Sequence, residues 1–255
     1  MAAQIIAIIN QKGGVCKTTT SLALAEGLVA MNKKVLTIDL DAQANRTLAA
    51  NILQPDNTIS QVLEGQQTIK DITVDTPGQG AIAPANITLA TTEATITGRA
   101  NNAEILKTAI GPIKNNYDYI IIDTAPHLDI LTTNALTAAE YIVIPTDTDI
   151  FSLSGISQLN ILLEAVKEKS NPDLKIAGLL ITKYERGIIN EEMKSQLEQM
   201  AQAMNTKVFK TPIRKAIAIK QAITEGKNIF TACPKSNSTI DYKNWIKELL
   251  RGIKK

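Results

Sequence analysis

A short glycine-rich segment near the beginning of the chain has the residue types that bind phosphate. Gln11-Lys12-Gly13-Gly14-Val15-Cys16-Lys17-Thr18-Thr19 follows an apolar run and precedes a pattern typical of a helix. Glycines allow backbone N–H groups to close around phosphate oxygens, and the N-terminus of the next helix adds the positive end of its dipole. Lys17 and Thr18 stand where a contact to the β- and γ-phosphates and a ligand of Mg²⁺ are expected. The segment therefore predicts a nucleotide site.

Three aspartates follow two buried strands that we expect further along the chain. Asp39 follows Lys34 to Ile38, Asp123 follows Tyr119 to Ile122, and Asp41 lies in the loop after Asp39. The carboxyl ends of strands in an open α/β sheet border the crevice where ligands bind. There Asp39 and Asp123 can hold Mg²⁺, and Asp41 can polarise an attacking water. The alternative, a pair of surface carboxylates at Asp39 and Asp41, conflicts with the apolar strand before them.

The elements that must position these residues alternate along the chain, as in βαβ units. We expect one α/β domain over residues 1–255, with a mostly parallel twisted sheet and helices on both faces. The segment from Thr73 to Asn102 is predicted to be irregular, with one strand-like piece at Ile87 to Ala90. The expected strands are Ile5 to Ile9, Lys34 to Ile38, Tyr119 to Ile122, Tyr141 to Ile144 and Lys175 to Ile181, and the expected helices are Thr18 to Met31, Ala103 to Lys114, Thr132 to Ala139, Ser152 to Lys169 and Asn190 to Met204.

Composition narrows the class of protein. The chain is 44% hydrophobic and 20% charged, which excludes a wholly disordered or collagen-like protein. No apolar run approaches the roughly 18 residues that span a bilayer, and the first ten residues lack the features of a signal peptide. Cys16 and Cys233 lack metal-ligand spacing, both with respect to each other and with respect to His127. We expect a cytoplasmic protein.

At these motifs the sequence resembles the ParA/MinD family of deviant Walker ATPases. Lys12 matches the extra lysine of the family's phosphate loop, and the resemblance continues through segments 38–43, 120–126, 132–136 and 144–146. It implies a P-loop NTPase fold with ATP and Mg²⁺ as cofactors. It also implies that Lys12 reaches the partner's phosphates in an ATP-dependent homodimer, and that Asp41 is the catalytic carboxylate.

Two residues depart from the family pattern. Cys16 replaces the usual glycine before Lys17, and Ala42 replaces the usual proline after Asp41. Glycine adopts conformations that cost other residues on the order of 1–3 kcal/mol, so Cys16 should weaken nucleotide binding or slow turnover. His127 follows Pro126 without a nucleophile partner, and we expect a solvent-facing or capping role for it.

The last fifth of the chain is strongly basic. From Lys207 onward there are 12 basic and 3 acidic residues, a net charge of +9, against −7 for the preceding part. We interpret this as a surface for a polyanion, with solubility as the alternative. An amphipathic helix from Thr239 to Ile253, with Ile246, Leu249, Leu250 and Ile253 on one face, is predicted to dock on the core.

The family resemblance suggests two roles for this region. Thr211, Pro212 and Ile213 would border the adenine base, together with Thr182. The candidates for contacts to DNA phosphates are Arg214, Lys215, Lys220, Lys227, Lys243, Lys247 and Arg251. Such contacts would make binding independent of base sequence and strongly dependent on salt.

The sequence therefore predicts an ATP-dependent DNA partition protein associated with the nucleoid. ATP would drive dimerisation, the dimer would bind DNA nonspecifically, and a ParB-type partner would stimulate hydrolysis and release.

Two alternatives stay open. A MinD-like ATPase would bind membrane through the last helix, which requires an exposed apolar face there, and the spread of charge from Lys207 argues against it. A nucleotide-binding scaffold with weak ATPase activity is suggested by Cys16.

Overall fold

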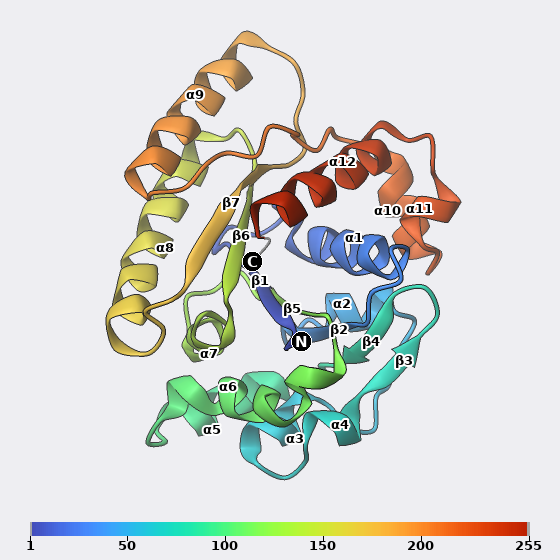
Figure 1. Cartoon of the computed structure of the whole chain (residues 1–255), viewed down its shortest axis with the longest axis vertical. Coiled ribbons are helices and arrows are strands. Elements are labelled where there is room, and N and C mark those ends of the chain that lie inside the picture. The colour runs from blue at the N-terminus through green and yellow to red at the C-terminus, as the bar shows by residue number, and fades with distance from the viewer. Residues whose placement is uncertain (1, 254–255) are drawn as a thin grey trace.

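A seven-stranded sheet runs through the computed structural model, which describes residues 2–253 (Figure 1). Its strand order is β3-β4-β2-β5-β1-β6-β7, and every neighbouring pair is parallel except β3 with β4. The strands are β1 Gln4–Ile8, β2 Val35–Leu40, β3 Val74–Thr76, β4 Gly80–Ala83, β5 Tyr119–Thr124, β6 Tyr141–Thr146 and β7 Lys175–Ile181. The carboxyl ends of the parallel strands therefore share one edge, where the phosphate loop and the three aspartates lie.

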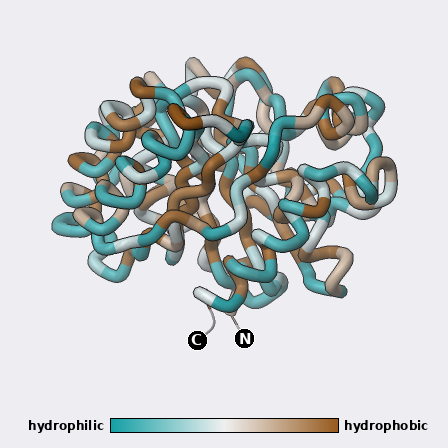
Figure 2. Tube along the Cα trace, turned by 90° about the horizontal axis from the view of Figure 1, so that it is seen from above, coloured by the Kyte–Doolittle hydropathy of each residue, from teal (hydrophilic) through white to brown (hydrophobic). Residues whose placement is uncertain are grey.

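Helices cover both faces of the sheet. Ile5 and Ala7 of β1 point into one core with helices α3 to α9, whereas Ile6 and Ile8 point into a second core with α1 and α10 to α12. Figure 2 shows the hydrophobic strands inside and hydrophilic positions on the outer turns. The helices are α1 Lys17–Val29, α2 Asn45–Ala49, α3 Ile59–Glu64, α4 Ile69–Ile72, α5 Leu89–Thr97, α6 Ile105–Ile110, α7 Ile130–Ala138, α8 Ile150–Lys169, α9 Ile188–Ala203, α10 Ile217–Thr224, α11 Ile229–Ala232 and α12 Asn237–Gly252, with 3₁₀ turns η1 Asn102–Glu104 and η2 Gly111–Asn116. This confirms the single α/β domain with a two-sided, mostly parallel sheet.

The segment from Thr73 to Asn102 is regular where the sequence predicts irregular chain. It contains β3, β4 and α5, and the strand expected at Ile87 to Ala90 is wrong because α5 begins at Leu89. Threonine favours strands, which hides the helix. In α5 the threonine hydroxyls bind carbonyls one turn back, as Thr95 does with Thr91. Leu89, Thr92 and Ile96 are buried.

The helix predicted for Ala103 to Lys114 is broken into η1, α6 and η2. Pro112 stands in the first turn of η2. Proline has no N–H group and its ring clashes with the preceding turn, so it ends the α-helix before it.

The last helix docks on α1, as predicted, and Figure 1 shows the two side by side. Ile246, Leu249 and Ile253 are buried there and Leu250 is half-buried. Within residues 2–253, no helix is both long enough and apolar enough to cross a membrane.

Candidate functional site

The phosphate loop connects β1 to α1 at the carboxyl edge of the sheet. Helix α1 begins at Lys17, no side chain caps its N-terminus, and its first turn contains no acidic residue. The first N–H groups of a helix lack partners within the helix, and its dipole favours negative charge there. The loop therefore leads into an uncapped helix N-terminus, which is suited to an anion.

A cavity of about 940 Å³ opens over this loop. Asp41, in the loop after β2, lines it on one side, and Ile213 lines it on the side of the C-terminal region. The loop contributes Gly13, Gly14, Cys16, Lys17, Thr18 and Thr19. One cavity thus brings together most of the predicted phosphate-binding residues, one of the predicted base-binding residues and the predicted catalytic carboxylate.

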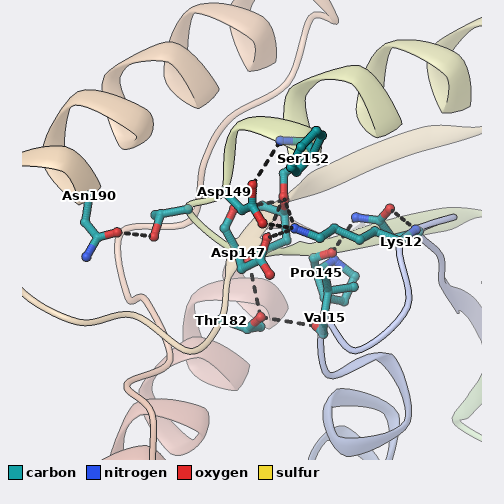
Figure 3. Close-up of polar contacts among 12 residues, drawn as sticks. Lys12, Val15, Pro145, Asp147, Asp149, Ser152, Thr182 and Asn190 are labelled. Carbon is teal, nitrogen blue, oxygen red and sulfur yellow. Dashed lines mark hydrogen bonds and ion pairs between the residues drawn. The ribbon is translucent and has the colours of Figure 1, made fainter.

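Lys12 does not itself line this cavity, but its side chain is bound to Asp147 and Asp149, which do. Its ammonium lies 2.8 Å from Asp147 Oδ1, 3.0 Å from Asp149 Oδ2 and 3.3 Å from Ser152 Oγ (Figure 3). Burial lowers the pKa of Lys12, but the hydrogen bonds and charges of Asp147 and Asp149 outweigh it and raise the pKa above its ordinary value. The lysine is therefore charged and held in place.

Lys17 is buried at the start of α1. Its ammonium donates to the carbonyl of Lys12, at 3.1 Å. Burial lowers the pKa of Lys17, while the charges of Asp123 and Asp41 oppose that shift. A buried ammonium at a helix N-terminus suits a negatively charged group.

The two predicted metal-binding aspartates face each other across neighbouring strands. Asp39 on β2 and Asp123 on β5 are register partners, and both are fully buried. Burial raises the pKa of both carboxyls, and the charge of Asp39 adds to the shift of Asp123. The Thr18 hydroxyl lies near Asp123 without forming a hydrogen bond of ordinary geometry, and lowers its pKa.

These two carboxylates differ in their partners. Asp39 accepts hydrogen bonds from the N–H of Asp41 at 3.2 Å, and from the N–H and hydroxyl of Thr47 at 2.9 and 2.7 Å. Neither oxygen of Asp123 has a hydrogen-bond partner among residues 2–253. A buried carboxylate without partners is costly unless a cation meets it. These carboxylates therefore fit Mg²⁺. Asp123 is the ligand whose oxygens have no partner among the described residues, and Asp39 also holds the loop after β2.

Asp41 lies in the loop after β2 and is nearly buried. It accepts a hydrogen bond from the N–H of Gln43 at 2.9 Å, which fixes one carboxylate oxygen, and it lines the cavity. This geometry allows a water molecule to lie between Asp41 and a bound phosphate.

Cys16 occupies a glycine-like conformation. Its φ of 64° and ψ of 31° lie in the left-handed region, which costs a residue with a Cβ about 1–2 kcal/mol. Burial raises the pKa of its thiol, while the charge of Lys183 opposes that shift. The backbone therefore adopts the left-handed conformation that the family's glycine suggests, although the residue here is a cysteine.

The predicted base-binding residues separate into two groups. Ile213 lines the cavity, whereas Thr182, Thr211 and Pro212 do not. The Thr182 hydroxyl lies within 3.2 Å of the carbonyls of Val15 and Thr146, so it ties β7 to the phosphate loop. Val15 is buried. Nucleotide contact stays a prediction for these residues, as it does for the predicted residues that line the cavity.

The basic residues also fall into groups. Arg214 binds Asp241 of α12 through Nε and Nη2, at 2.8 and 2.7 Å, and so anchors α12. Lys215 pairs with Glu185 and Lys227 with Glu225. The exposed side chains of Lys220, Lys243, Lys247 and Arg251 form no ion pair with residues 2–253. These four form the uncompensated part of the predicted DNA surface.

Sequence reasoning missed the residues that hold Lys12. Asp147, Asp149 and Ser152 follow β6, and Asn10 accepts the Lys12 N–H and donates to the Pro145 carbonyl. Their place in the sequence offered a signal. They follow a strand whose carboxyl end lies at the same edge of the sheet as the phosphate loop. His127 is exposed, in agreement with the expectation.

Comparison with known proteins identifies the family. Residues 3–176 match the family model described as an AAA domain. The sporulation initiation inhibitor protein Soj of Bacillus subtilis is 36% identical over 250 residues, covering 96% of this chain and 98% of Soj. The chromosome partitioning protein ParA of Myxococcus xanthus is 32% identical, covering 97% of this chain and 88% of that protein. The chain belongs to the ParA/MinD family of P-loop ATPases.

A solved structure has the same fold with nucleotide bound. Cobyrinic acid a,c-diamide synthase from Mycobacterium smegmatis, with ADP and magnesium, has a TM-score of 0.85 at 30% identity. The match covers 98% of this chain and 94% of that one. This relative binds a nucleotide and Mg²⁺ on the same fold.

Proposed function

We propose that this protein is an ATP-dependent DNA partition protein. The observation that carries the proposal is the meeting of the phosphate loop, the facing aspartates Asp39 and Asp123, and Asp41 at one edge of the sheet. The likeness to Soj and ParA supports it over nearly the whole chain.

ATP binds at the open N-terminus of α1. Loop N–H groups and Lys17 meet the phosphates, and the apolar wall at Ile213 meets the base. Mg²⁺, when bound, neutralises phosphate charge, and Thr18, Asp123 and Asp39 would hold it. The unpartnered oxygens of Asp123 support this assignment.

Asp41 is the group that acts on the attacking water. Its carboxylate borders the cavity and is oriented by the Gln43 N–H. By accepting a hydrogen bond from water, it directs a lone pair toward the terminal phosphate and takes up the developing proton.

Dimerisation is the step that uses Lys12. In the chain by itself this lysine is bound to Asp147 and Asp149. In an ATP-bound homodimer it exchanges these carboxylates for phosphate oxygens of the nucleotide held by the partner subunit. Both environments are anionic, so the ammonium stays charged throughout.

The dimer binds DNA through its basic C-terminal region, nonspecifically. Lys243, Lys247 and Arg251 repeat every four residues along the exposed side of α12, which aligns their charges. No base-reading motif accompanies them, so they contact backbone phosphates. A ParB-type partner then stimulates hydrolysis, and the released monomer leaves the nucleoid.

The experiment is retention of DNA by the purified protein in four states: with ATP, with ADP, without nucleotide, and with ATP plus EDTA. The proposal expects DNA to be retained only in the state that contains ATP and Mg²⁺. Retention that is equal in all four states would contradict ATP control, and no retention in any state would contradict DNA binding.

A second candidate, a nucleotide-binding scaffold with weak ATPase activity, is favoured by Cys16 in its left-handed conformation. Measured turnover separates it from the partition ATPase. The MinD-like alternative requires an exposed apolar face on α12, and that face is covered by the core.

A further inference from the structure

Lys183 lies two residues after the end of β7, at the edge of the sheet where β1 leads into the phosphate loop. Its ammonium lies 3.7 Å from the point where a Cβ on Gly14 would stand, and it lines the same cavity as the loop. Its φ of 52° is in the left-handed region. For a lysine this conformation is strained, and such strain is concentrated at functional positions.

The three lysines near the phosphate loop differ in their counter-ions. Lys12 is held by Asp147 and Asp149, and Lys17 lies near Asp41 and Asp123. Lys183 forms no ion pair within residues 2–253. A cation without an ion-pair partner, beside an open helix N-terminus, favours an anion at that end of the cavity.

We propose that Lys183 is a phosphate-binding residue of the nucleotide site. It reaches the phosphate chain from the β7 wall of the cavity, whereas Lys17 reaches it from α1. A lysine suits this place because its ammonium is a compact charge with three donors on a flexible stem, and can follow the phosphates as they move. The inference rests on the proposed ATP site and adds to it a residue from the opposite half of the chain.

The test uses the full chain with Mg²⁺ and measures ADP binding by titration calorimetry, which avoids turnover. Lys183→Met should weaken ADP binding about tenfold, the usual effect of losing one hydrogen bond to a charged group. Lys183→Arg should restore most of the affinity. The matched control is Lys175→Met at the opposite end of β7, which is exposed and should bind ADP as the parent does.

The salt dependence of binding distinguishes a phosphate contact from other roles. Parent binding should weaken more steeply with NaCl than binding by Lys183→Met, because one ionic contact has been removed. Equal slopes for the two proteins would contradict an ionic contact at Lys183.

Several results would overturn the inference. Unchanged ADP affinity in Lys183→Met, with a parent that binds ADP, would overturn the role of Lys183 alone. An equal loss for adenosine and ADP would assign the side chain to the nucleoside instead. A parent that binds neither ADP nor ATP would overturn this inference and the proposed function together.

Discussion

The Lys12 ammonium lies 2.8 Å from Asp147 Oδ1 of its own chain, although 135 positions separate the two residues. Both side chains are about a quarter exposed, at 23% each. Ion pairs with this exposure contribute about 0–1 kcal/mol, so the contact can be exchanged for another anion at little cost. A lysine held in this way is available to a partner's phosphates once they approach.

The first prediction concerns dimerisation. Lys12→Ala should fold normally and lose the ATP-dependent dimer, whereas Asp147→Asn with Asp149→Asn should release Lys12 and strengthen dimerisation by up to about tenfold. Analytical ultracentrifugation with ATP over a range of protein concentrations measures both. A Lys12→Ala protein that dimerises as the parent does would contradict the role of Lys12.

The second prediction concerns Asp41. Asp41→Ala keeps the phosphate loop, Lys17 and Asp123, but removes the cavity-lining carboxylate that we propose orients water. The variant should bind ATP with the parent's affinity, lose hydrolysis by about 10²- to 10⁴-fold, and hold DNA longer. Phosphate release and DNA dissociation are the measurements. Hydrolysis at the parent rate would exclude Asp41 as the catalytic residue.

The third prediction places the DNA surface on α12. Lys243→Glu with Lys247→Glu should weaken DNA binding strongly, reduce its salt dependence, and leave nucleotide binding intact, because both side chains are exposed and unpaired with residues 2–253. Lys33→Glu with Lys70→Glu makes the same change of charge at exposed positions elsewhere. If both double variants lose DNA equally, net charge rather than α12 explains binding.

Arg214 would give an ambiguous test of the same surface. Its guanidinium binds Asp241 at 2.7 and 2.8 Å and holds α12 near the loop after β7. Charge reversal at Arg214 would leave two carboxylates facing each other there. Loss of DNA binding could then follow from displacement of α12 alone.

The sequence predicts the parts of the site that depend on local order. The phosphate loop, Asp39 and Asp123 each follow an apolar strand, and the carboxyl ends of parallel strands must meet at one edge. The left-handed conformation of Cys16 is also predictable, because this position is a glycine in the family that the sequence resembles. These inferences need only neighbouring residues and the rule for parallel sheets.

Contacts between distant segments could not be predicted in the same way. The pairs Lys12 with Asp147 and Arg214 with Asp241 depend on which loops the fold brings together. Helix α5 was missed because its threonines favour strands, and burial of Leu89 and Ile96 decides the outcome. Tertiary packing overrides local preference at such positions.

The fourth prediction concerns the pH dependence of stability. Glu26 of α1 is fully buried, accepts the Ile229 N–H at 2.8 Å, and leaves Oε1 without a partner among residues 2–253. Burial raises its pKa to about 7, while the Ile229 hydrogen bond and the charge of Arg46 oppose the shift. The folded protein therefore binds a proton here that the unfolded chain has lost, so stability falls as pH rises from about 4.5 to about 7.

Glu26→Gln should remove that part of the pH dependence, which is worth up to about 3 kcal/mol between pH 5 and pH 8. Urea unfolding at intervals across this range measures it. Glu198→Gln, at an exposed position on α9, is the control and should follow the parent. A parent and a Glu26→Gln protein with parallel profiles would show that Glu26 does not titrate in this range.

The last prediction concerns Cys16, whose φ of 64° is one that glycine adopts without strain. Cys16→Gly should relieve about 1–2 kcal/mol of backbone strain, less a few tenths of a kcal/mol or more for the added freedom of the unfolded chain. It also removes a side chain from the lining of the cavity, so the loop N–H groups can approach phosphate oxygens more closely. ATP affinity or turnover should therefore rise.

Cys16→Ala keeps the Cβ without the sulfur and should stay close to the parent if backbone strain is the cause. Equal nucleotide affinity and equal turnover in the parent and Cys16→Gly would show that the loop has adapted to the cysteine, and the weak-ATPase alternative would lose its main support.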